Sequence, residues 1–264
     1  MNNPEIDISV KLGPNMKQGK NTPIFRYLSR ERFLEMVEGG INVFAHLSMW
    51  EDPYEAFLLR AALLHSHEEG AADLSLYGRY KSVYGQCWTY NSKDSDLLWR
   101  ANGRRGDVVR IKSTVKKLLT SIVDADKTSD KNGLSLLQIG EVEYVEKAKL
   151  DRMISDRCVV EDVMEDPKRK MEFFFKKRIG FDDEKEVRAI MDVQDDNCLD
   201  MDTDINGSLL RFRICPEELI DEVLVDPCMG RREYEQLICR VLHRCPSLEI
   251  RQSTLFKWPN SCYQ

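Results

Sequence analysis

The chain has 264 residues, of which 42% are hydrophobic and 32% charged, and its 39 basic and 45 acidic side chains give a net charge of −6. This length predicts one or two domains with a hydrophobic core, and the composition excludes a disordered or collagen-like chain. No apolar run approaches the roughly 20 residues that cross a bilayer, and the first twenty residues hold no apolar block, so we expect no membrane partner and no secretory signal.

Residues 1–22 are polar and predict a flexible amino-terminal segment. From residue 23 onward, short apolar runs alternate irregularly with helical patterns, and no Gly/Ser/Pro-rich linker divides them. The sequence therefore predicts a single α+β domain over 23–264. The expected strands are 23–28, 41–44, 84–90, 106–112, 140–145, 186–191, 209–214, 222–226 and 247–253. The expected helices span 30–38, 113–119, 149–178 and 231–243, and others begin at Asp94 and Pro216, with polar loops at 124–133 and 192–206.

Metal-binding patterns are weak in this sequence. Eight cysteines form no C-x-x-C pair and lie mostly beside apolar residues, which predicts reduced, buried cysteines in a cytoplasmic protein. Residues 202–207 match the first half of an EF-hand loop, but the twelfth position falls on Arg213, which cannot bind calcium. His65 and His67 could form a metal pair, although a solvated helix end is the commoner arrangement. We therefore expect no metal site.

Common phosphate-binding and hydrolase motifs are missing, since the sequence contains no Walker A loop, G-x-G-x-x-G, G-x-S-x-G or H-E-x-x-H. Two groups of basic side chains nevertheless stand out in this acidic chain. They either form charged helix faces or bind the phosphates of a cofactor or a nucleic acid. The candidates for nucleic-acid contact are Arg100, Arg104, Arg105, Lys176 and Lys177.

The segment from Glu184 to Arg188 enters an apolar strand with the sequence E-K-E-V-R. Because side chains alternate along a strand, Glu184 and Glu186 are expected to point to the same side. Two like charges so close together are unfavourable unless a cationic substrate or partner uses them. The alternative is an exposed strand edge at which Lys185 and Arg188 neutralise the glutamates, and the segment taken alone favours this alternative.

A series of short motifs runs through most of the chain, over roughly 23–253. In order, these are Phe25-Arg26-Tyr27-Leu28, Asp52-Pro53-Tyr54-Glu55, Cys87-Trp88-Thr89, Leu97-Leu98-Trp99, and Lys177 followed by Glu184-x-Glu186-x-Arg188. The ordered set resembles a large, poorly characterised bacterial domain family, which in turn is similar to the ADP-ribosyltransferase superfamily. The chain departs from the family pattern at Phe181, where Trp is usual, and at Ala101-Asn102, where an aromatic residue is usual.

The resemblance implies a split β-sheet core of mixed or antiparallel strands with flanking helices, and NAD as the donor. It also implies three strand-borne site elements in the order Arg26, Thr89 and Glu186. Glu186 would stabilise the positive charge that develops on the ribose, Thr89 would orient it, and Glu184 would orient or deprotonate the acceptor. Arg26 would hold the pyrophosphate. The remaining NAD-binding residues would be Tyr27, Trp88, Tyr90 and Trp99.

These features predict an NAD-dependent ADP-ribosyltransferase that modifies a macromolecule, as a bacterial toxin or antiphage effector. RNA is the favoured acceptor over protein or DNA, because three arginines follow Trp99 and the basic run 176–178 precedes Glu184. A cognate antitoxin protein would be a further partner. Two alternatives stay open: a non-catalytic nucleic-acid or protein-binding module that uses the basic helices, and an NAD glycohydrolase with water as the acceptor.

Overall fold

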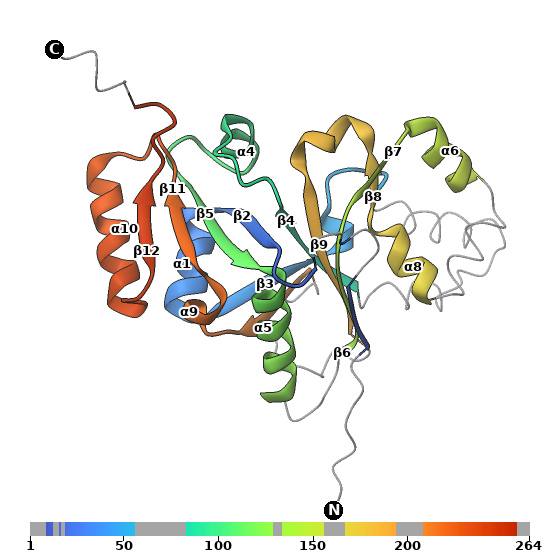
Figure 1. The fold of residues 1–264 in the computed structure, drawn as a ribbon, viewed down its shortest axis with the longest axis horizontal. Coiled ribbons are helices and arrows are strands. Elements are labelled where there is room, and N and C mark those ends of the chain that lie inside the picture. The colour runs from blue at the N-terminus through green and yellow to red at the C-terminus, as the bar shows by residue number, and fades with distance from the viewer. Residues whose placement is uncertain are drawn as a thin grey trace, which may run out of the picture. The chain divides into compact units, whose positions relative to one another are not determined.

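The computed structural model describes residues 9–12, 16, 19–55, 83–128, 134–155, 167–193 and 208–257 (Figure 1). The chain forms two compact units whose segments alternate along the sequence, and we name them the β9 unit and the β5 unit after one strand of each. The β9 unit comprises Met1–Gly19, Val43–Cys87 and Val123–Phe212, and the β5 unit comprises Lys20–Asn42, Trp88–Ile122 and Arg213–Gln264. A single domain over 23–264 stays a prediction.

In the β9 unit the strands follow the order β1-β6-β9-β4, and β3 pairs with both β4 and β10. The unit's sheet is mixed, because β1 runs parallel to β6 whereas β9 runs antiparallel to it. A separate parallel pair is formed by β7 and β8. The elements are β1 Ser9–Leu12, β3 Ile41–His46, η1 Leu47–Met49, β4 Val83–Thr89, β6 Leu134–Glu141, β7 Glu143–Val145, α6 Lys147–Ser155, α8 Pro167–Phe173, β8 Lys176–Arg178, η2 Ile179–Glu184, β9 Glu186–Val193 and β10 Leu209–Arg213.

Strand β9 is apolar at most positions, as expected for a strand that is covered on both faces. Its fully buried apolar side chains are Val187, Ala189, Ile190 and Met191. The charged residues Glu186 and Arg188 are equally buried in the same strand. On β4, Gly85 allows Trp50 a close approach, because a Cβ atom at Gly85 would lie 2.5 Å from the Trp50 ring. Strands β9 and β4 thus carry the buried residues around which the candidate site described below is formed.

In the β5 unit the strands follow the order β2-β5-β11-β12. Both β2 and β11 run antiparallel to β5, whereas β12 runs parallel to β11, so this sheet is mixed as well. The elements are β2 Pro23–Ser29, α1 Arg30–Gly39, α4 Asp96–Ala101, β5 Val108–Thr114, α5 Val115–Thr128, α9 Pro216–Leu219, β11 Glu222–Val225, α10 Arg231–Arg244 and β12 Glu249–Gln252.

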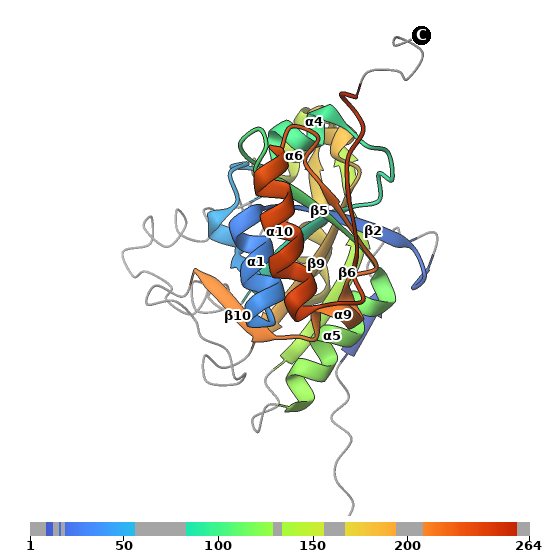
Figure 2. The same ribbon diagram turned by 90° about the vertical axis from the view of Figure 1, so that its left-hand side faces the viewer.

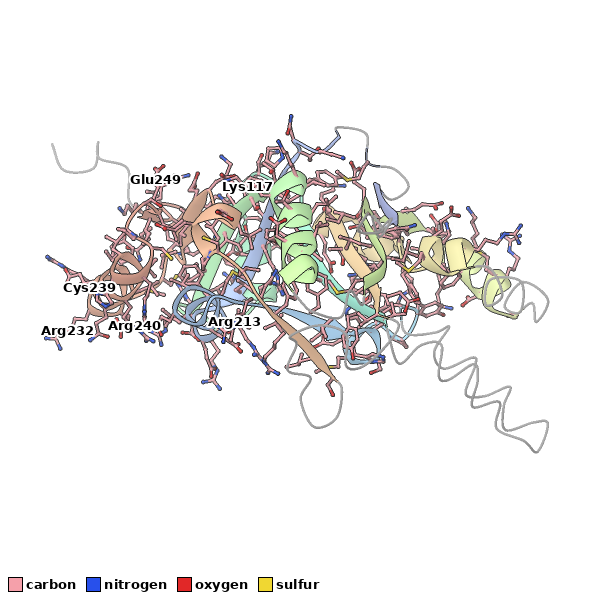
Figure 3. The ribbon with its side chains drawn as sticks, turned by 90° about the horizontal axis from the view of Figure 1, so that it is seen from below. Lys117, Arg213, Arg232, Cys239, Arg240 and Glu249 are labelled. Carbon is pink, nitrogen blue, oxygen red and sulfur yellow. The ribbon has the colours of Figure 1, made fainter. Side chains whose placement is uncertain are left out.

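Two helices of the β5 unit, α1 and α10, lie side by side (Figure 2). Ser29 caps α1 by accepting a hydrogen bond from the backbone N–H of Arg32, and Gly40 ends the helix with a left-handed φ of 62°. The guanidinium of Arg240 on α10 donates two hydrogen bonds of 2.7 Å to the carboxylate of Glu38 on α1. On the outer side of α10, Figure 3 shows Arg232 and Cys239 pointing away from the ribbon.

The α+β class and the mixed sheet are confirmed, but several elements differ from the expectation. The predicted helix 149–178 is wrong at its end, where 176–178 form β8. The side chains of Phe173, Phe174 and Phe175 are all buried, and three consecutive residues cannot share one face of a helix, so the chain leaves the helix there. Helix α5 begins later than predicted and continues through Thr128, into the expected polar loop.

The expected flexible segment 1–22 contains β1, whose Ser9–Leu12 pair with β6. The cysteines are less buried than predicted, because Cys245 is buried but Cys87, Cys215 and Cys239 are exposed. All described cysteines are free. The half EF-hand at 202–207 and both His65 and His67 lie outside the described residues. Over the described segments, no group of three or more His, Cys, Asp or Glu side chains is placed to hold a metal ion. Within those segments, no helix has the length and apolar character needed to span a membrane.

Candidate functional site

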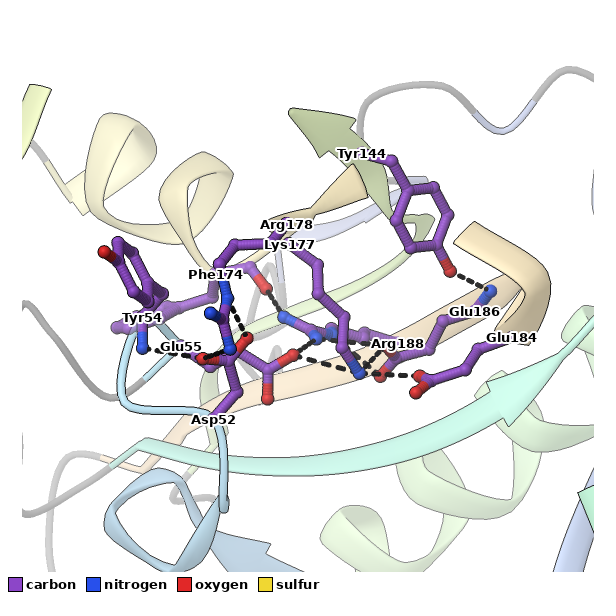
Figure 4. A network of polar contacts seen from close by, with 10 residues as sticks. All are labelled: Asp52, Tyr54, Glu55, Tyr144, Phe174, Lys177, Arg178, Glu184, Glu186 and Arg188. Atoms are coloured by element: carbon purple, nitrogen blue, oxygen red, sulfur yellow. Dashed lines mark hydrogen bonds and ion pairs between the residues drawn. The ribbon is translucent and has the colours of Figure 1, made fainter. Parts of the chain in front are cut away.

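A buried group of ionised side chains lies at the start of β9, within the β9 unit (Figure 4). We call Glu55, Lys177, Glu184, Glu186 and Arg188 the charge cluster. The ammonium nitrogen of Lys177 lies 2.6 Å from Oε2 of Glu184 and 3.1 Å from Oε2 of Glu186. It also lies 3.2 Å from Oε1 of Glu55. Three carboxylates therefore meet at one ammonium group.

Arg188 forms the buried end of the cluster, and its side chain is 0% exposed. Its guanidinium donates to both carboxylate oxygens of Glu186, at 2.9 Å and 3.0 Å, and forms an ion pair with Glu55. It also donates to the carbonyl oxygen of Phe174 and lies 4.4 Å from the centre of the Trp50 ring. These contacts compensate the buried charge of Arg188. Removing one partner of a buried ion pair typically lowers the free energy of unfolding by about 3–5 kcal/mol.

The two glutamates of the E-x-E segment differ in their electrostatic environment. Burial alone would raise the pKa of Glu186, but the charge and hydrogen bonds of Arg188, together with Lys177, lower it to about 2. Burial raises the pKa of Glu184 above its ordinary value, although Lys177 opposes this effect. The side chain of Glu186 is 4% exposed and that of Glu184 is 38% exposed. Glu186 is thus a fixed negative charge, whereas Glu184 is the accessible and titratable member of the pair.

The backbone explains why both glutamates reach the same lysine. Glu184 ends the short helix η2, and Lys185 then adopts a left-handed conformation with φ 46° and ψ 52°. This conformation is uncommon for a residue other than glycine and is held in place by its surroundings. The N–H of Glu186 donates a 2.8 Å hydrogen bond to the hydroxyl of Tyr144, which fixes the first residue of β9. The predicted convergence of the glutamates is therefore produced by a turn, and not by strand alternation.

The motif Asp52–Glu55 forms a turn that supports the cluster from the side. Glu55 contacts both cations of the cluster, and Asp52 accepts hydrogen bonds of 3.0 and 3.3 Å from the guanidinium of Arg178. The Tyr54 ring lies 4.7 Å below the same guanidinium. The ring of Phe181 lies 4.9 Å from the Lys177 ammonium, so the residue at the position where the resembling family has Trp covers the cluster lysine.

The thiol of Cys87 on β4 lies close enough to Glu186 for the two groups to shift each other's pKa. Cys87 is exposed, whereas its neighbours along β4 are buried. The cluster therefore has exposed groups at Cys87 and Glu184, although Arg188 and Glu186 are buried. Glu184 is therefore the accessible carboxylate of the cluster, whereas desolvation and the charge of Glu186 raise the pKa of the Cys87 thiol and keep it protonated at neutral pH.

The residues predicted to bind NAD belong to the β5 unit. Arg26 is half-buried on β2, and Thr89 accepts a 3.0 Å hydrogen bond from the N–H of Asn91 through its hydroxyl. Tyr27 and Trp99 pack edge to face, with ring centres 4.9 Å apart. The exposed fractions are 7% for Tyr27, 3% for Trp88, 4% for Trp99 and 37% for Tyr90. The structure thus brings Glu184, Glu186 and Lys177 together, and separately it brings Tyr27 and Trp99 together.

The predicted nucleic-acid contacts fall into two groups. In the β5 unit, Arg100, Arg104 and Arg105 are exposed, and Arg105 donates to the sulfur of Cys228 at 3.0 Å. In the β9 unit, Lys176 forms an ion pair with Glu143, and Lys177 is held inside the charge cluster. The ammonium of Lys177 is therefore engaged by carboxylates and is not presented to a phosphate.

The sequence predicted no site role for Glu55 or Tyr144, and it placed Arg178 in a basic run expected to approach a nucleic acid. Glu55 lies in a recognised motif, so its placement beside the cluster could have been inferred from that motif. Arg188 carried a weaker signal, because residues 186 and 188 of one strand share a face and bear opposite charges. Tyr144 carried no signal, because its contact with Glu186 joins positions 42 residues apart.

Comparisons with known proteins give a weak structural similarity and no sequence match. No protein-family model matches the chain, and no curated protein matches it in sequence. The chain is similar to a solved structure described as Thermus sp. 2.9 DarT in complex with ADP-ribosylated ssDNA, with 12% identity and a TM-score of 0.34, over 88% of this chain and 94% of that chain. A likeness at this level establishes neither the fold type nor the activity of this chain. The preference for RNA over DNA is wrong as stated, because the nucleic acid in that complex is DNA.

Proposed function

We propose that the charge cluster is the catalytic centre of an NAD-dependent ADP-ribosyltransferase. The observation that carries the proposal is the convergence of Glu184 and Glu186 on Lys177 at the start of β9. With three carboxylates and two cations, the ionised cluster has a net charge of −1. A preorganised negative centre stabilises a transition state in which positive charge develops on the substrate.

The chemistry of NAD fits such a centre, because its ribose C1′ gains positive charge as nicotinamide departs with the electrons of the glycosidic bond. Glu186 is held ionised by Arg188 and supplies a fixed negative charge for this step. Glu184 is the accessible carboxylate and accepts the proton of the acceptor as the acceptor's nucleophile forms the new bond to C1′. The motif series that resembles the ADP-ribosyltransferase superfamily supports NAD as the donor.

A negative cluster suits the ribose and does not suit the pyrophosphate, so the pyrophosphate needs basic residues elsewhere. Arg26 stays the prediction for this role, and Thr89 stays the predicted partner of the catalytic glutamate. Among the predicted aromatic residues, Tyr90 has the most exposed ring and is the best supported for contact with nicotinamide. The bacterial toxin or antiphage role, the cognate antitoxin and the cytoplasmic location stay predictions.

The test is incubation of the full chain with NAD labelled in its ADP-ribose part, together with single-stranded DNA, with protein acceptors or with no acceptor. Nicotinamide release and acceptor labelling are measured together. The proposal predicts matched release and labelling with one acceptor class, and a much slower release without an acceptor. Release at the same rate without any acceptor would favour the NAD glycohydrolase. No release under any condition would overturn the proposal.

The same assay is run on Glu184→Gln, which should lose the activity. Its matched control is Asp183→Asn, which removes an exposed carboxylate next to Glu184 in the sequence. Asp183 takes no part in the charge cluster, so this variant is expected to retain the activity of the unaltered chain. A loss of activity in Asp183→Asn would show that any charge change in η2 is damaging, and that the cluster is not specifically required.

A further inference from the structure

Lys177 lies at the centre of the charge cluster. It is the common partner of Glu55, Glu184 and Glu186, and its side chain is only 10% exposed. The strand pair β7–β8 fixes its backbone, since Lys177 is in register with Tyr144. The ring of Phe181 covers the ammonium on another side. The Lys177 ammonium therefore interacts with the neighbouring carboxylates and not with a ligand that arrives from solvent.

The contact between Glu184 and this lysine is the shortest of its three ion pairs, at 2.6 Å. Glu55 and Glu186 also contact Arg188, whereas Glu184 accepts a 2.6 Å hydrogen bond from the ammonium of Lys177. The groups facing Glu184 are Lys177 from β8, Glu186 from β9, Glu55 from the 52–55 turn and Tyr144 from β7. Apart from Lys177, these groups are anionic or neutral, so they oppose a negative charge on Glu184 or leave it unaffected.

We infer that Lys177 is a positioning residue of the proposed catalytic centre, where its ammonium holds Glu184 in place and in the ionised form that accepts a proton. This inference rests on the proposed function, which assigns the proton-accepting role to Glu184. Without Lys177, Glu184 keeps its burial and its anionic neighbours Glu55 and Glu186 but loses the positive charge 2.6 Å away. It then holds a proton to higher pH and is unavailable as a base on the acid side.

The direct test is the pH profile of kcat/KM for nicotinamide release by Lys177→Met. We expect its activity relative to the unaltered chain to fall by about tenfold on the acid side of the profile and much less on the alkaline side, because the acid limb moves to higher pH. Lys177→Arg keeps a cation at this position, and it should retain the original limb and recover most of the activity. An equal loss at every pH, with no rescue by arginine, would overturn the inference and leave a purely structural role.

Lys149→Met serves as the matched control, because Lys149 is an exposed lysine of the same unit whose ammonium lies 3.8 Å from Glu143. It should leave the profile unchanged. If Lys177→Met does not fold, Lys177→Gln carries the same test, since it also removes the charge but keeps a hydrogen-bond donor.

A second measurement separates the inference from the proposed function. The carboxyl carbon of Glu184 is titrated by NMR in the full chain and assigned by its loss in Glu184→Gln. In Lys177→Met the titration of Glu184 should move to higher pH, whether or not the protein turns over NAD. An unmoved titration would overturn the inference. Absence of NAD turnover in the unaltered chain, with a shifted titration, would overturn the proposed function alone.

Discussion

The charge cluster of the β9 unit and the aromatic cluster of the β5 unit contain residues of the same motif series, but different forces hold them. In the β5 unit, the rings of Tyr27 and Trp99 meet at 84° and are buried with three aliphatic side chains. Such a cluster is stabilised by burial of apolar surface and by ring contacts. In the β9 unit, Arg188 and Glu186 are as deeply buried, but each is charged.

This contrast indicates which motifs carry function and which carry packing. Buried aromatic residues need no further role, because their burial itself stabilises the fold. Buried ion pairs are a poor means of stabilisation, because removing two charges from water costs as much as their attraction returns. A group of ionisable residues with shifted pKa values, partly accessible at Glu184, is therefore the better candidate for a functional site.

The largest expected effect is that of Arg188→Met, which removes the buried cation shared by Glu55 and Glu186. We expect the free energy of unfolding to fall by about 3–5 kcal/mol, because two buried carboxylates then share Lys177 alone. Chemical denaturation followed by circular dichroism measures the change. Arg213→Met, at an exposed arginine of β10 labelled in Figure 3, should change stability by less than about 0.5 kcal/mol. A similar, small effect for both variants would contradict the charge cluster as described.

A smaller effect on the free energy of unfolding is expected when the pH is lowered. The pKa of Glu186 is lowered from 4.5 to about 2 in the folded chain, so its ionised form stabilises the fold above pH 4.5. This contribution, on the order of 3 kcal/mol, is lost progressively as the pH falls from 4.5 towards 2. Denaturation between pH 5 and pH 3, with the Glu186 carboxyl followed by NMR, checks the prediction. Titration of Glu186 near its ordinary pKa would contradict it.

The smallest expected effect on stability is that of a substitution in the aromatic cluster of the β5 unit. In Trp99→Phe, the carboxylate of Asp94 loses the indole N–H that donates to it at 2.7 Å. We expect a loss of about 1–3 kcal/mol in the free energy of unfolding. If Trp99 is only a core residue, the affinity of the folded variant for NAD measured by calorimetry stays unchanged. A clear loss of NAD affinity at unchanged stability would support the prediction that Trp99 binds NAD.

The sequence alone predicted elements whose signals are local. Helix α1 has its Ser29 cap and its Gly40 terminus in the sequence, and the strands around 108–114 and 186–193 are marked by apolar runs. Strand β8 was missed, because a run of lysine and arginine is compatible with a solvated helix and only its pairing with β7 makes it a strand. Long-range pairing of this kind leaves no local pattern to read.

The candidate site was predicted in its residue types but not in its connections. The sequence singled out Glu184 and Glu186, yet it assigned Lys177 to a nucleic acid, and the structure instead encloses Lys177 among carboxylates. It offered Arg188 as a partner of the glutamates at an exposed strand edge, whereas in the structure Arg188 is fully buried and contacts both oxygens of Glu186. For this reason Glu186→Gln is a poor probe of catalysis, because it would leave a buried guanidinium short of its partner.

The central claim is that Glu184, the accessible carboxylate of the charge cluster, accepts the acceptor's proton as ADP-ribose is transferred from NAD. The most direct test is nicotinamide release by Glu184→Gln beside the unaltered chain and the Asp183→Asn control, at pH 7 and with folding checked for each. The account predicts a loss of about 100-fold or more in Glu184→Gln alone, with little change in its stability. Turnover by a folded Glu184→Gln at the rate of the unaltered chain would contradict the claim.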